Sequence, residues 1–582
     1  MKKHKTILFW CIVFCGMFAY LQWINNYLFY YVEQIQIFFL TKVYFAETVL
    51  RPGGLSLYVA RFIQQFYILP LAGALLISLL LTLMGITLQS TLKKMAPANT
   101  LYLLYVLPPL ALLLMHLDFD YFLQGTVSYL FMVGLFCFYV RCERVGLRLA
   151  LGIGGALGLF LVAGSVASLF AALVLLWEVL VRRKGWYFSV LPVLVAGLIG
   201  FLAVRLSFAG EYRMVFLPDA YYEPLVQVNK LYLSWIALPL SIVIAWLLRK
   251  KEEASPKKGI LWFSLQTAAT LYLLYLTHLF SPGEVIRNNV EQDLYSRNGE
   301  WDKVISTFPN KDYNLQTLNV LNMALMQKKQ LGERLFSYDQ RGSQCLVADW
   351  DVTLQHAIAL SDVYYTVGDI AASQKLAFEG YIASTQGGSV RLLQRLVETN
   401  LIFGAYPIAE KYIRLLENTL FYRNWAKEMR RFLYNDKAVE QDFLLGGKRK
   451  SLCNNDIYAV STNKETVLEQ LAINNPANRA AMEYLAAGYL LDKKLDLYRL
   501  LIEKHFGTKI WPELSTCMQE AVIALEEDDP QYWLHHGVNL KVEQHYGKFR
   551  YDIDNQQHNI NFHQLIASTY GHTFWYYFMF KK

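Results

Sequence analysis

The pattern of apolar and polar positions changes abruptly near residue 282. Residues 1–281 contain runs of about 20 apolar residues, the length that crosses ~30 Å of hydrocarbon. Residues 282–582 instead mix charged and apolar positions as a water-soluble helical protein does. We therefore predict a transmembrane domain over 1–281 and a soluble domain over 282–582.

The apolar runs predict nine membrane-crossing helices. The first extends from Ile7 to about Trp23, and we interpret it as an uncleaved anchor because no small-x-small cleavage site follows it. The stretch 149–181 counts as two short helices, since Gly164-Ser165 divides it and positive charges bracket both ends. The remaining runs lie near 67–89, 100–117, 126–141, 149–163, 166–181, 187–207, 230–248 and 260–280.

Lysine and arginine cluster in alternate loops between these runs. The clusters are at residues 2–5, 93–94, 141–148, 182–184 and 249–258. Because positive loops stay on the cytoplasmic side, the N-terminus is predicted to be cytoplasmic. Nine crossings then place the soluble domain outside the cytoplasm, which in a Gram-negative cell is the periplasm. The predicted location is the inner membrane.

Short breaks separate paired helical patterns in the soluble domain. Trp301, Leu331, Ile370 and Tyr406 each open a helix after a break, at spacings of 30, 39 and 36 residues, and a fifth break precedes Leu495. These spacings straddle the period of about 34 residues of tetratricopeptide repeats and predict degenerate TPR-like repeats. An irregular helical bundle is the alternative. The predicted fold class is all-α, a polytopic transmembrane bundle followed by a soluble α-helical-repeat domain.

The composition agrees with a membrane protein and disfavours two other classes. The chain is 55% hydrophobic and 18% charged, below the usual quarter. Its net charge of +8 accompanies loops that flank apolar runs, so we expect no nucleic-acid partner. The seven cysteines include no CxxC pair, which argues against a zinc site or a disulfide framework.

A long outer loop over 26–66 carries the first candidate site residues. Glu33 stands where the first span emerges, and a carboxylate held there suggests a site because ionised groups avoid the membrane core. Arg51 opens an Arg-Pro-Gly-Gly corner, and Arg61 follows it. The corner separates two apolar faces that suit helices lying in the membrane interface. These faces are Ile35, Phe38, Phe39, Phe45 and Val49, then Leu55, Tyr58, Val59, Phe62, Ile63 and Phe66.

Two shorter outer segments carry further candidates. Asp118 and Asp120 form an Asp-x-Asp that can hold a divalent cation or make a solvated turn, and the turn is the simpler interpretation. Asp219, Tyr221 and Tyr222 combine a carboxylate with aromatic rings, which suits a sugar or a lipid headgroup. Interfacial tyrosines also serve as plain membrane anchors.

This layout resembles the GT-C superfamily of membrane glycosyltransferases. The resemblance implies transfer of a sugar from a polyprenyl-phosphate donor at the outer leaflet, and some members carry a C-terminal tetratricopeptide domain. It implies Glu33 as the general base toward the acceptor hydroxyl and Asp118 or Asp120 as the second acid. Arg51 or Arg61 would neutralise the departing phosphate.

The resemblance covers residues 1–280 as a layout and departs from the superfamily at Glu33-Gln34. Members usually show two adjacent acids there, and the amide of Gln34 cannot share a metal charge. The pattern therefore disfavours a divalent-cation cofactor. The whole chain also resembles an uncharacterised bacterial family of multi-pass membrane proteins, through Arg51-Pro-Gly-Gly-Leu55 and Phe574-Trp-Tyr-Tyr-Phe578. That likeness implies no activity.

Three features near the C-terminal end have plain interpretations. Gly446-Gly-Lys-Arg-Lys450 lacks the spacing of a P-loop and is predicted to be a basic loop. The run Thr573–Phe580 is too short to span and would pack into the last repeat, or touch the membrane or a partner. Six histidines lack the spacing of a zinc site and favour packing or surface positions. They are His535, His536, His545, His558, His563 and His572.

Two functions of different classes remain open. The first is glycosyl or related group transfer at the outer leaflet, with the repeat domain guiding a protein or glycan acceptor. The second is a non-enzymatic, membrane-anchored scaffold or complex subunit of the cell envelope whose repeats bind a partner. Membrane lipids surround the protein in both. A coupled transporter fits less well, because the spans lack charged residues at mid-depth, apart from Glu178 and Arg205 near their ends.

Overall fold

The computed structural model describes residues 2–95, 101–183, 186–208, 210–224, 230–249, 256–280, 283–349, 353–385, 387–452, 463–556 and 560–581. Over these residues the chain forms helices and two isolated β-bridges, and no strand, so the predicted all-α class is confirmed. It divides into unit 1, Met1–Pro282 with Asn418–Phe421, and unit 2, Gly283–Glu417 with Tyr422–Lys582. Predictions at Lys184, Pro282, Cys453 and His558 fall outside the described residues.

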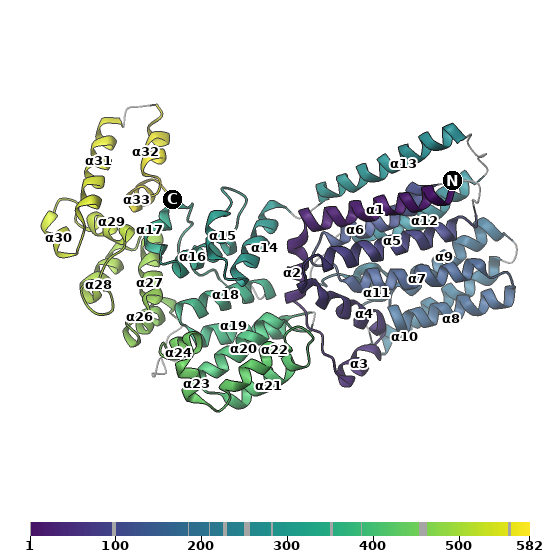
Figure 1. Cartoon of the computed structure of the whole chain (residues 1–582), viewed down its shortest axis with the longest axis horizontal. Coiled ribbons are helices and arrows are strands. Elements are labelled where there is room, and N and C mark those ends of the chain that lie inside the picture. Colours follow the sequence, from purple (N-terminus) through teal and green to yellow (C-terminus); the bar gives the residue numbers. More distant parts are fainter. Residues whose placement is uncertain are drawn as a thin grey trace. The chain divides into compact units, whose positions relative to one another are not determined.

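Unit 1 is a bundle of long apolar helices with shorter helices at one end (Figure 1). Its helices are α1 (Lys2–Ile24), α2 (Asn26–Gln34), α3 (Lys42–Val49), α4 (Gly54–Gln64), α5 (Ala72–Leu92), α6 (Tyr102–His116), α7 (Leu123–Arg141), α8 (Val145–Ala163), α9 (Val166–Trp177), α10 (Val190–Arg205), α11 (Tyr212–Phe216), α12 (Lys230–Leu248) and α13 (Pro256–Leu276). Four 3₁₀ turns and one π-helical turn join them: η1 (Gln65–Ile68), η3 (Trp186–Ser189), η4 (Pro218–Tyr221), η5 (Thr277–Phe280) and the π turn η2 (Glu178–Arg182).

Seven of the described helices are long and apolar enough to cross a membrane, which indicates a membrane protein. They are α1, α5, α7, α8, α10 with η3, α12, and α13 continued by η5. Two predicted spans are shorter than the roughly 20 residues that a crossing needs, since α6 has 15 residues and α9 has 12. Helix α9 gains length because it continues directly into η2.

Close contacts between helices of unit 1 depend on small residues. Gly85 of α5 faces Trp10 of α1, and a Cβ on Gly85 would lie 2.1 Å from the indole ring. The same indole donates its Nε1 hydrogen to Oε1 of Gln89 at 2.9 Å. The amide oxygen of Gln89 therefore satisfies the indole N–H inside the bundle, where no water is at hand.

Helix α8 begins four residues before its predicted start. The sequence pattern places Arg148 in the loop before the span. In the structure it lies in the first turn of α8 and is 8% exposed. Its Nη1 donates to both carboxylate oxygens of Glu178, at 3.1 and 3.2 Å. The opposite charge of Glu178 compensates the buried guanidinium, which is why Arg148 can enter the helix.

The loop over residues 26–66 differs from its predicted pair of helices. Residues 35–41 form no helix, and α3 starts at Lys42 because the hydroxyl of Thr41 caps it by accepting from Tyr44 N at 3.2 Å. Phe38 is buried and packs against Tyr58 and Phe62 of α4, with ring centroids 5.0 and 5.6 Å apart. The predicted single face over 35–49 is therefore wrong.

Helix α4 packs against α7 and α8 through its small and polar side, not through its aromatic side. The buried positions on α4 are Gly54, Ser56, Ala60 and Gln64. Its aromatic side faces α3 and the segment 35–41, which precedes α3. The second predicted helix is thus confirmed, and the side that contacts α7 and α8 is not its predicted apolar face.

Unit 2 consists of shorter helices joined by tight turns. They are α14 (Glu284–Arg297), α15 (Trp301–Ser306), α16 (Leu315–Gln327), α17 (Leu331–Arg334), α18 (Leu354–Val367), α19 (Ile370–Ala383), α20 (Val390–Phe403), α21 (Tyr406–Glu417), α22 (Arg423–Met429), α23 (Asp436–Gln441), α24 (Phe443–Arg449), α26 (Lys464–Asn474), α27 (Arg479–Leu491), α28 (Leu495–His505), α29 (Thr516–Leu525), α30 (Pro530–His535), α31 (Leu540–Gln556), α32 (Phe562–Tyr570) and α33 (Phe574–Phe580).

All five predicted breaks are left-handed turns between consecutive helices. In each, the residue after the turn donates its N–H to the carbonyl five positions earlier, at 2.7–2.9 Å, which is the Schellman arrangement. The helix pairs differ in length, since α17 has 4 residues whereas α18 and α19 have 14 each. The left-handed residues are Gly299, Lys329, Gly368, Gly404 and Lys493, with φ of 68°, 56°, 93°, 74° and 57°.

The predicted basic loop at Gly446–Lys450 is instead largely helix α24. Asp442 caps this helix by accepting from Leu444 N and Leu445 N, at 3.0 and 2.9 Å. Lys448 donates to the carbonyl of Thr366, near the end of α18, at 2.8 Å. Arg449 donates to the last carbonyls of α20. Cations complement the partial negative charge of helix C-termini, so the basic residues of α24 stabilise two neighbouring helices.

The aromatic run near the C-terminal end packs into the core of unit 2. Phe574, Trp575 and Tyr577 of α33 are at most 7% exposed. Trp575 Nε1 donates to the carbonyl of Glu520 on α29 at 2.8 Å. Of the alternatives for this run, the structure shows packing within the unit. Nearby, the imidazole rings of His545 and His572 stack 5.8 Å apart.

Candidate functional site

The candidate site is built on the loop between α6 and α7. The N–H of Asp120 donates to Oδ1 of Asp118 at 3.2 Å, so the Asp-x-Asp forms a tight turn closed by its own side chain. The chain leaves α6 at His116 and enters α7 at Leu123. The turn therefore holds both carboxyl groups at one end of the bundle.

A second segment pairs with this loop through the backbone. Tyr121 and Tyr222 form an antiparallel bridge. The N–H of Phe122 donates to the carbonyl of Tyr221 at 2.9 Å, and the N–H of Glu223 donates to the carbonyl of Asp120 at 3.0 Å. Residues about 100 positions apart are thus brought side by side, and Glu223 joins the two aspartates.

Asp118 is engaged by two groups from distant parts of the sequence. Its Oδ2 accepts a 2.7 Å hydrogen bond from the hydroxyl of Tyr222 and lies 2.6 Å from Nζ of Lys230. The side chain of Asp118 is 16% exposed and that of Lys230 is 31% exposed. The ammonium group of Lys230 therefore occupies the place beside Asp118 that a bound cation would take.

Asp120 has the electrostatic character of an acid–base group. Burial, together with the negative charges of Asp118 and Glu223, raises the pKa of Asp120 to about 7, although Lys230 acts in the opposite direction. A carboxyl group with this pKa exchanges its proton near neutral pH. Such a group can serve as a general base or a general acid.

Asp219 and Tyr221 are committed to contacts inside the protein. Asp219 accepts from Arg213 at 2.7 Å and from the hydroxyl of Tyr232 at 3.0 Å. The hydroxyl of Tyr221 donates to the carbonyl of Ala163 at 2.5 Å and accepts from Val166 N at 3.1 Å. Tyr221 thereby fastens the turn between α8 and α9. Both residues shape the site instead of projecting into solvent.

The Arg51-Pro-Gly-Gly corner docks on that same turn. Gly53 adopts φ +74°, and its N–H donates to the carbonyls of Phe160 and Leu161 at 3.1 and 2.9 Å. A Cβ on Gly53 would lie 3.3 Å from Cα of Gly164, so the two backbones touch. The side chain of Arg51 is exposed. The corner therefore serves to pack the helices together at this end of the bundle.

Arg61 lies on helix α4 and contacts Tyr44. Its Nη1 donates to the hydroxyl of Tyr44 at 3.2 Å. Its Nε is buried and has no hydrogen-bond partner. A guanidinium N–H without a partner can donate a hydrogen bond to an anion. The contact with Tyr44, however, places Arg61 beside α3 and not beside Asp118.

Glu33 lies on helix α2, which borders the loop of the two aspartates through Tyr31. The rings of Tyr31 and Phe119 lie 5.0 Å apart. Glu33 is two positions further, roughly 200° around the helix, on the side of Phe29. Phe29 packs against Tyr67 at 5.1 Å. Glu33 is 3% exposed, and the helical repeat turns it away from Phe119.

One member of the cluster, Lys230, is not predicted from the sequence. Lys230 begins α12 at the end of the bundle that also carries the aspartates. A single lysine at the end of an apolar span that the sequence predicts to be the outer one runs against the usual charge bias, and that departure is a signal for it. Glu223 follows Tyr222 directly, and only the pairing of the two loops reveals its place. Among the described residues, no group of three or more His, Cys, Asp and Glu side chains could hold a metal ion.

The chain matches a family of unknown function, DUF6057, over residues 2–581. It belongs to that family. No curated protein and no solved structure matches it. Because the DUF6057 match runs through both units, the family is defined by the membrane helices and the helical domain together.

The two motifs that suggested an uncharacterised family both have structural roles in this DUF6057 member. Gly53 of the Arg-Pro-Gly-Gly-Leu corner touches Gly164, as described above. The aromatic run contributes Phe574 and Trp575 to the core of unit 2. Each motif thus secures one unit, and neither supplies the polar cluster around Asp120.

Proposed function

We propose that the chain is a membrane-embedded group-transfer enzyme in which Asp120 is the acid–base group. The observation that carries the proposal is the pKa of about 7 at Asp120, within a cluster that joins two loops. Ordinary turn aspartates are solvated and ionised well below neutral pH. The chain instead holds this carboxyl half-buried beside two other acids, an arrangement typical of reaction centres.

The proposed reaction is glycosyl transfer from a polyprenyl-phosphate sugar, as the GT-C layout suggests. The acceptor oxygen forms a bond to the anomeric carbon while its proton passes to the carboxylate of Asp120. The bond from the anomeric carbon to the phosphate oxygen breaks, and its electron pair leaves with the phosphate. Lys230 offers the positive charge closest to Asp118 for that phosphate.

This proposal moves the base from Glu33 to Asp120. Glu33 faces the side of α2 that packs on Tyr67, whereas Asp120 lies in the cluster with Asp118 and Glu223. A base must reach the proton that it removes, so the position of Asp120 supports the role better. Glu33 would then maintain the fold of the first outer loop.

The proposed topology places this site and unit 2 outside the cytoplasm. In unit 1 the corner at Gly53, the turn at Gly164 and the paired loops at Tyr121 and Tyr222 meet at one end, as alternate crossings require. Positive-inside bias makes that end the outer one. A reporter fused after Lys582 should be active only outside the cytoplasm, and cytoplasmic activity would refute the orientation.

A second candidate function is a non-enzymatic scaffold whose TPR-like unit 2 binds a protein partner. It is supported by the internal contacts of Asp118, Asp219 and Tyr221, whose side chains all bind other groups of the protein. In this reading the cluster fixes the loops. Stacked helix pairs present extended binding surfaces, which suits a scaffold.

Replacement of Asp120 separates the two functions. Asp120→Asn keeps the size of the side chain and removes its ability to take a proton. We expect the variant to accumulate normally and to fail to rescue a deletion phenotype. Glu211→Gln is the matched control, since Glu211 is an exposed acid of the neighbouring outer segment. Full rescue by an Asp118→Asn, Asp120→Asn double variant would favour the scaffold.

A further inference from the structure

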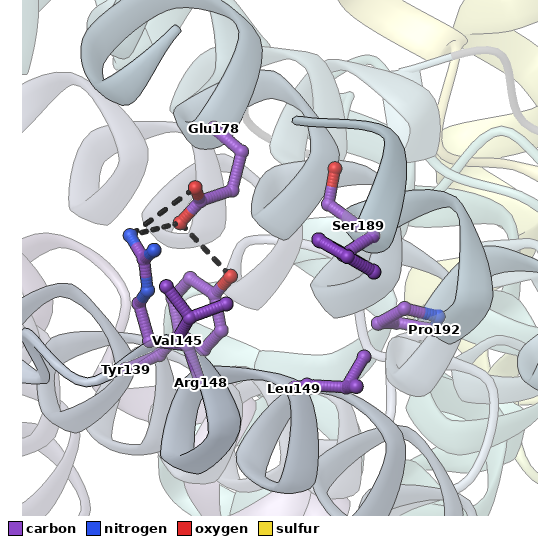
Figure 2. A pocket seen from close by; sticks show the side chains of 8 residues that line it. Tyr139, Val145, Arg148, Leu149, Glu178, Ser189 and Pro192 are labelled. Atoms are coloured by element: carbon purple, nitrogen blue, oxygen red, sulfur yellow. Dashed lines mark hydrogen bonds and ion pairs between the residues drawn. The ribbon is translucent and has the colours of Figure 1, made fainter. Parts of the chain in front are cut away.

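A small pocket, open to the surface and with a cavity volume of about 20 Å³, lies at the end of unit 1 opposite to Asp120. Asp120 precedes the first turn of α7, whereas Tyr139 in the last turn of α7 lines the cavity. The starts of α8 and α10, the turn η3 and Glu178 of η2 contribute the rest of the wall. Figure 2 shows Arg148, Glu178 and Tyr139 on one side of the space, with Ser189, Pro192 and Leu149 across from them.

The polar wall has one unused edge. Nη1 of Arg148 donates to both oxygens of Glu178, and the hydroxyl of Tyr139 donates to Oε1 of Glu178 at 3.0 Å. Nε of Arg148 is buried and has no hydrogen-bond partner. Arg148 thus uses one end of its guanidinium for Glu178. Its Nε–Nη2 edge is the fork that binds carboxylates and phosphates through two parallel bonds.

A purely structural ion pair would not explain this arrangement. A buried donor without a partner costs about 1–3 kcal/mol, and ionised groups within membrane helices commonly mark functional sites. Glu178 also begins the π-helical turn η2, a distortion that is frequent at functional sites. Arg148, Glu178 and Tyr139, which form this network, all line the same pocket.

The surroundings indicate which anion fits. Trp186, Tyr187 and Phe188 lie beside the cavity wall with 48%, 59% and 40% of their surfaces exposed. Exposed aromatic residues at the end of a membrane helix lie at the level of lipid headgroups. Arg144 and Arg183, at the same end, are exposed and positive. Basic pockets between membrane helices are sites for anionic lipid headgroups.

We propose that this cavity binds the phosphate group of a membrane phospholipid through the Nε–Nη2 edge of Arg148. Glu178 and Tyr139 hold the guanidinium in place from the other side. The aromatic residues of η3 contact the glycerol and acyl part of the same lipid. This site is separate from the cluster at Asp120 and does not depend on the function proposed for it.

The test measures lipid binding to the purified full chain in detergent. Phosphatidylglycerol should raise the melting temperature and remain bound in native mass spectrometry. Arg148→Lys keeps the charge that compensates Glu178 but lacks the fork, so we expect it to fold and to bind phosphatidylglycerol at least about tenfold more weakly. Equal binding by parent and Arg148→Lys would overturn the proposal.

Three further measurements define the ligand and control the variants. Diacylglycerol with the same acyl chains should bind weakly, and binding equal to that of phosphatidylglycerol would show that phosphate is not recognised. Inorganic phosphate at the same concentration should have little effect, and an equal effect would refute the lipid part. An Arg148→Gln, Glu178→Gln double variant should fold without binding. Arg205→Gln, at the other end of α10, should bind like the parent.

Discussion

Glu520 accepts a 2.7 Å hydrogen bond from the backbone N–H of Phe574, the first residue of helix α33. Burial raises the pKa of Glu520 to about 8, although this bond acts in the opposite direction. The helix that carries the aromatic run is therefore attached to a carboxyl group that keeps its proton at neutral pH. This attachment makes the stability of unit 2 dependent on pH.

We expect the free energy of unfolding to fall as the pH rises from about 5 to about 8. In the folded chain Glu520 retains its proton up to about pH 8, whereas in the unfolded chain it releases the proton near its ordinary pKa of 4.5. The folded state binds more protons in this window and loses stability as the pH rises. Glu520→Gln keeps an oxygen for Phe574 and should flatten this dependence.

Unfolding of the detergent-solubilised chain between pH 5 and pH 9 checks this expectation. The variant should exceed its parent by several kcal/mol at pH 8, since each unit of pKa corresponds to about 1.4 kcal/mol. Glu483, whose pKa burial raises to about 7, is present in both proteins, so their difference isolates Glu520. The exposed Glu513 supplies the control Glu513→Gln. Identical pH slopes for parent and Glu520→Gln would contradict the assignment.

The charges around Asp120 predict how any activity of unit 1 depends on pH. If Asp120 accepts a proton in the reaction, the rate should rise with pH through about 7, because the carboxylate is the active form. Lys230→Gln removes a positive charge that lowers this pKa and should move the midpoint upward. Glu223→Gln removes a negative charge and should move it downward. A pH profile that both substitutions leave in place would exclude Asp120 as the titrating group.

Gly53→Ala should destabilise unit 1 by about 1–2 kcal/mol or more. The substitution puts a side chain at φ +74°, which costs roughly 1–2 kcal/mol, and its Cβ would press on the backbone of Gly164. Thermal unfolding in detergent measures the effect. Gly158→Ala in α8 is the matched control, because a Cβ at Gly158 meets open space. Equal melting temperatures for the two variants would show that the corner does not depend on its glycine.

Lys329→Gly should stabilise unit 2 by up to about 1 kcal/mol. Lys329 is an exposed residue at φ 56°, where glycine avoids the steric cost that other residues bear. Lys375→Gly in the middle of α19 should have the opposite effect, since glycine costs about 1 kcal/mol in a helix interior. Chemical denaturation compares the two variants. A loss of stability in Lys329→Gly would refute the strain inferred at that turn.

Arg391→Leu should destabilise unit 2 by about 3–5 kcal/mol, because it leaves buried acids without their partner. Arg391 lies 2.8 Å from Asp293 and also pairs with Asp362, and its side chain is 11% exposed. Although burial acts the other way, Arg391 and Arg395 hold the pKa of Asp362 below its ordinary value. This contribution is present above that ordinary value and is lost in acid.

Arg414→Leu is the control for Arg391→Leu. Arg414 is 67% exposed and pairs with Glu410, so its loss should cost under about 1 kcal/mol. Denaturant unfolding at pH 7 and pH 3 gives both values. The gap between Arg391→Leu and its parent should narrow at the lower pH. A gap that widens in acid would contradict the sign of the shift at Asp362.

The membrane helices and the five turns could be predicted because their signals are local. A long apolar run specifies a span, and a Gly or Lys-Lys after a helical period specifies a break. The start of α8 could not be predicted in this way, because Arg148 has the sequence appearance of a loop charge. Only the approach of Glu178, 30 positions away, makes a helical position acceptable for it.

The candidate site shows the same division between local and distant information. Asp118 and Asp120 were found as polar residues at the end of a span. Their electrostatics depend on Tyr222, which is 104 positions from Asp118, and on Lys230, and no periodic pattern links these segments. The sequence indicates Glu33 by its position after the first span. In the structure, helix α2 directs Glu33 to another side. The sequence shows which residues share a side of a helix, but which neighbour that side faces depends on what the helix packs against.

The left-handed turns of unit 2 also bear on the order in which its parts can form. Each turn joins helices that are neighbours in the chain, so their contacts close a short loop, and short loops close quickly. The pairs α18–α19 and α20–α21 can assemble as soon as their own residues are available. Helix α33 is different, since Phe574 must reach Glu520, 54 positions earlier. Helix α33 is therefore expected to join unit 2 after the neighbouring helix pairs have formed.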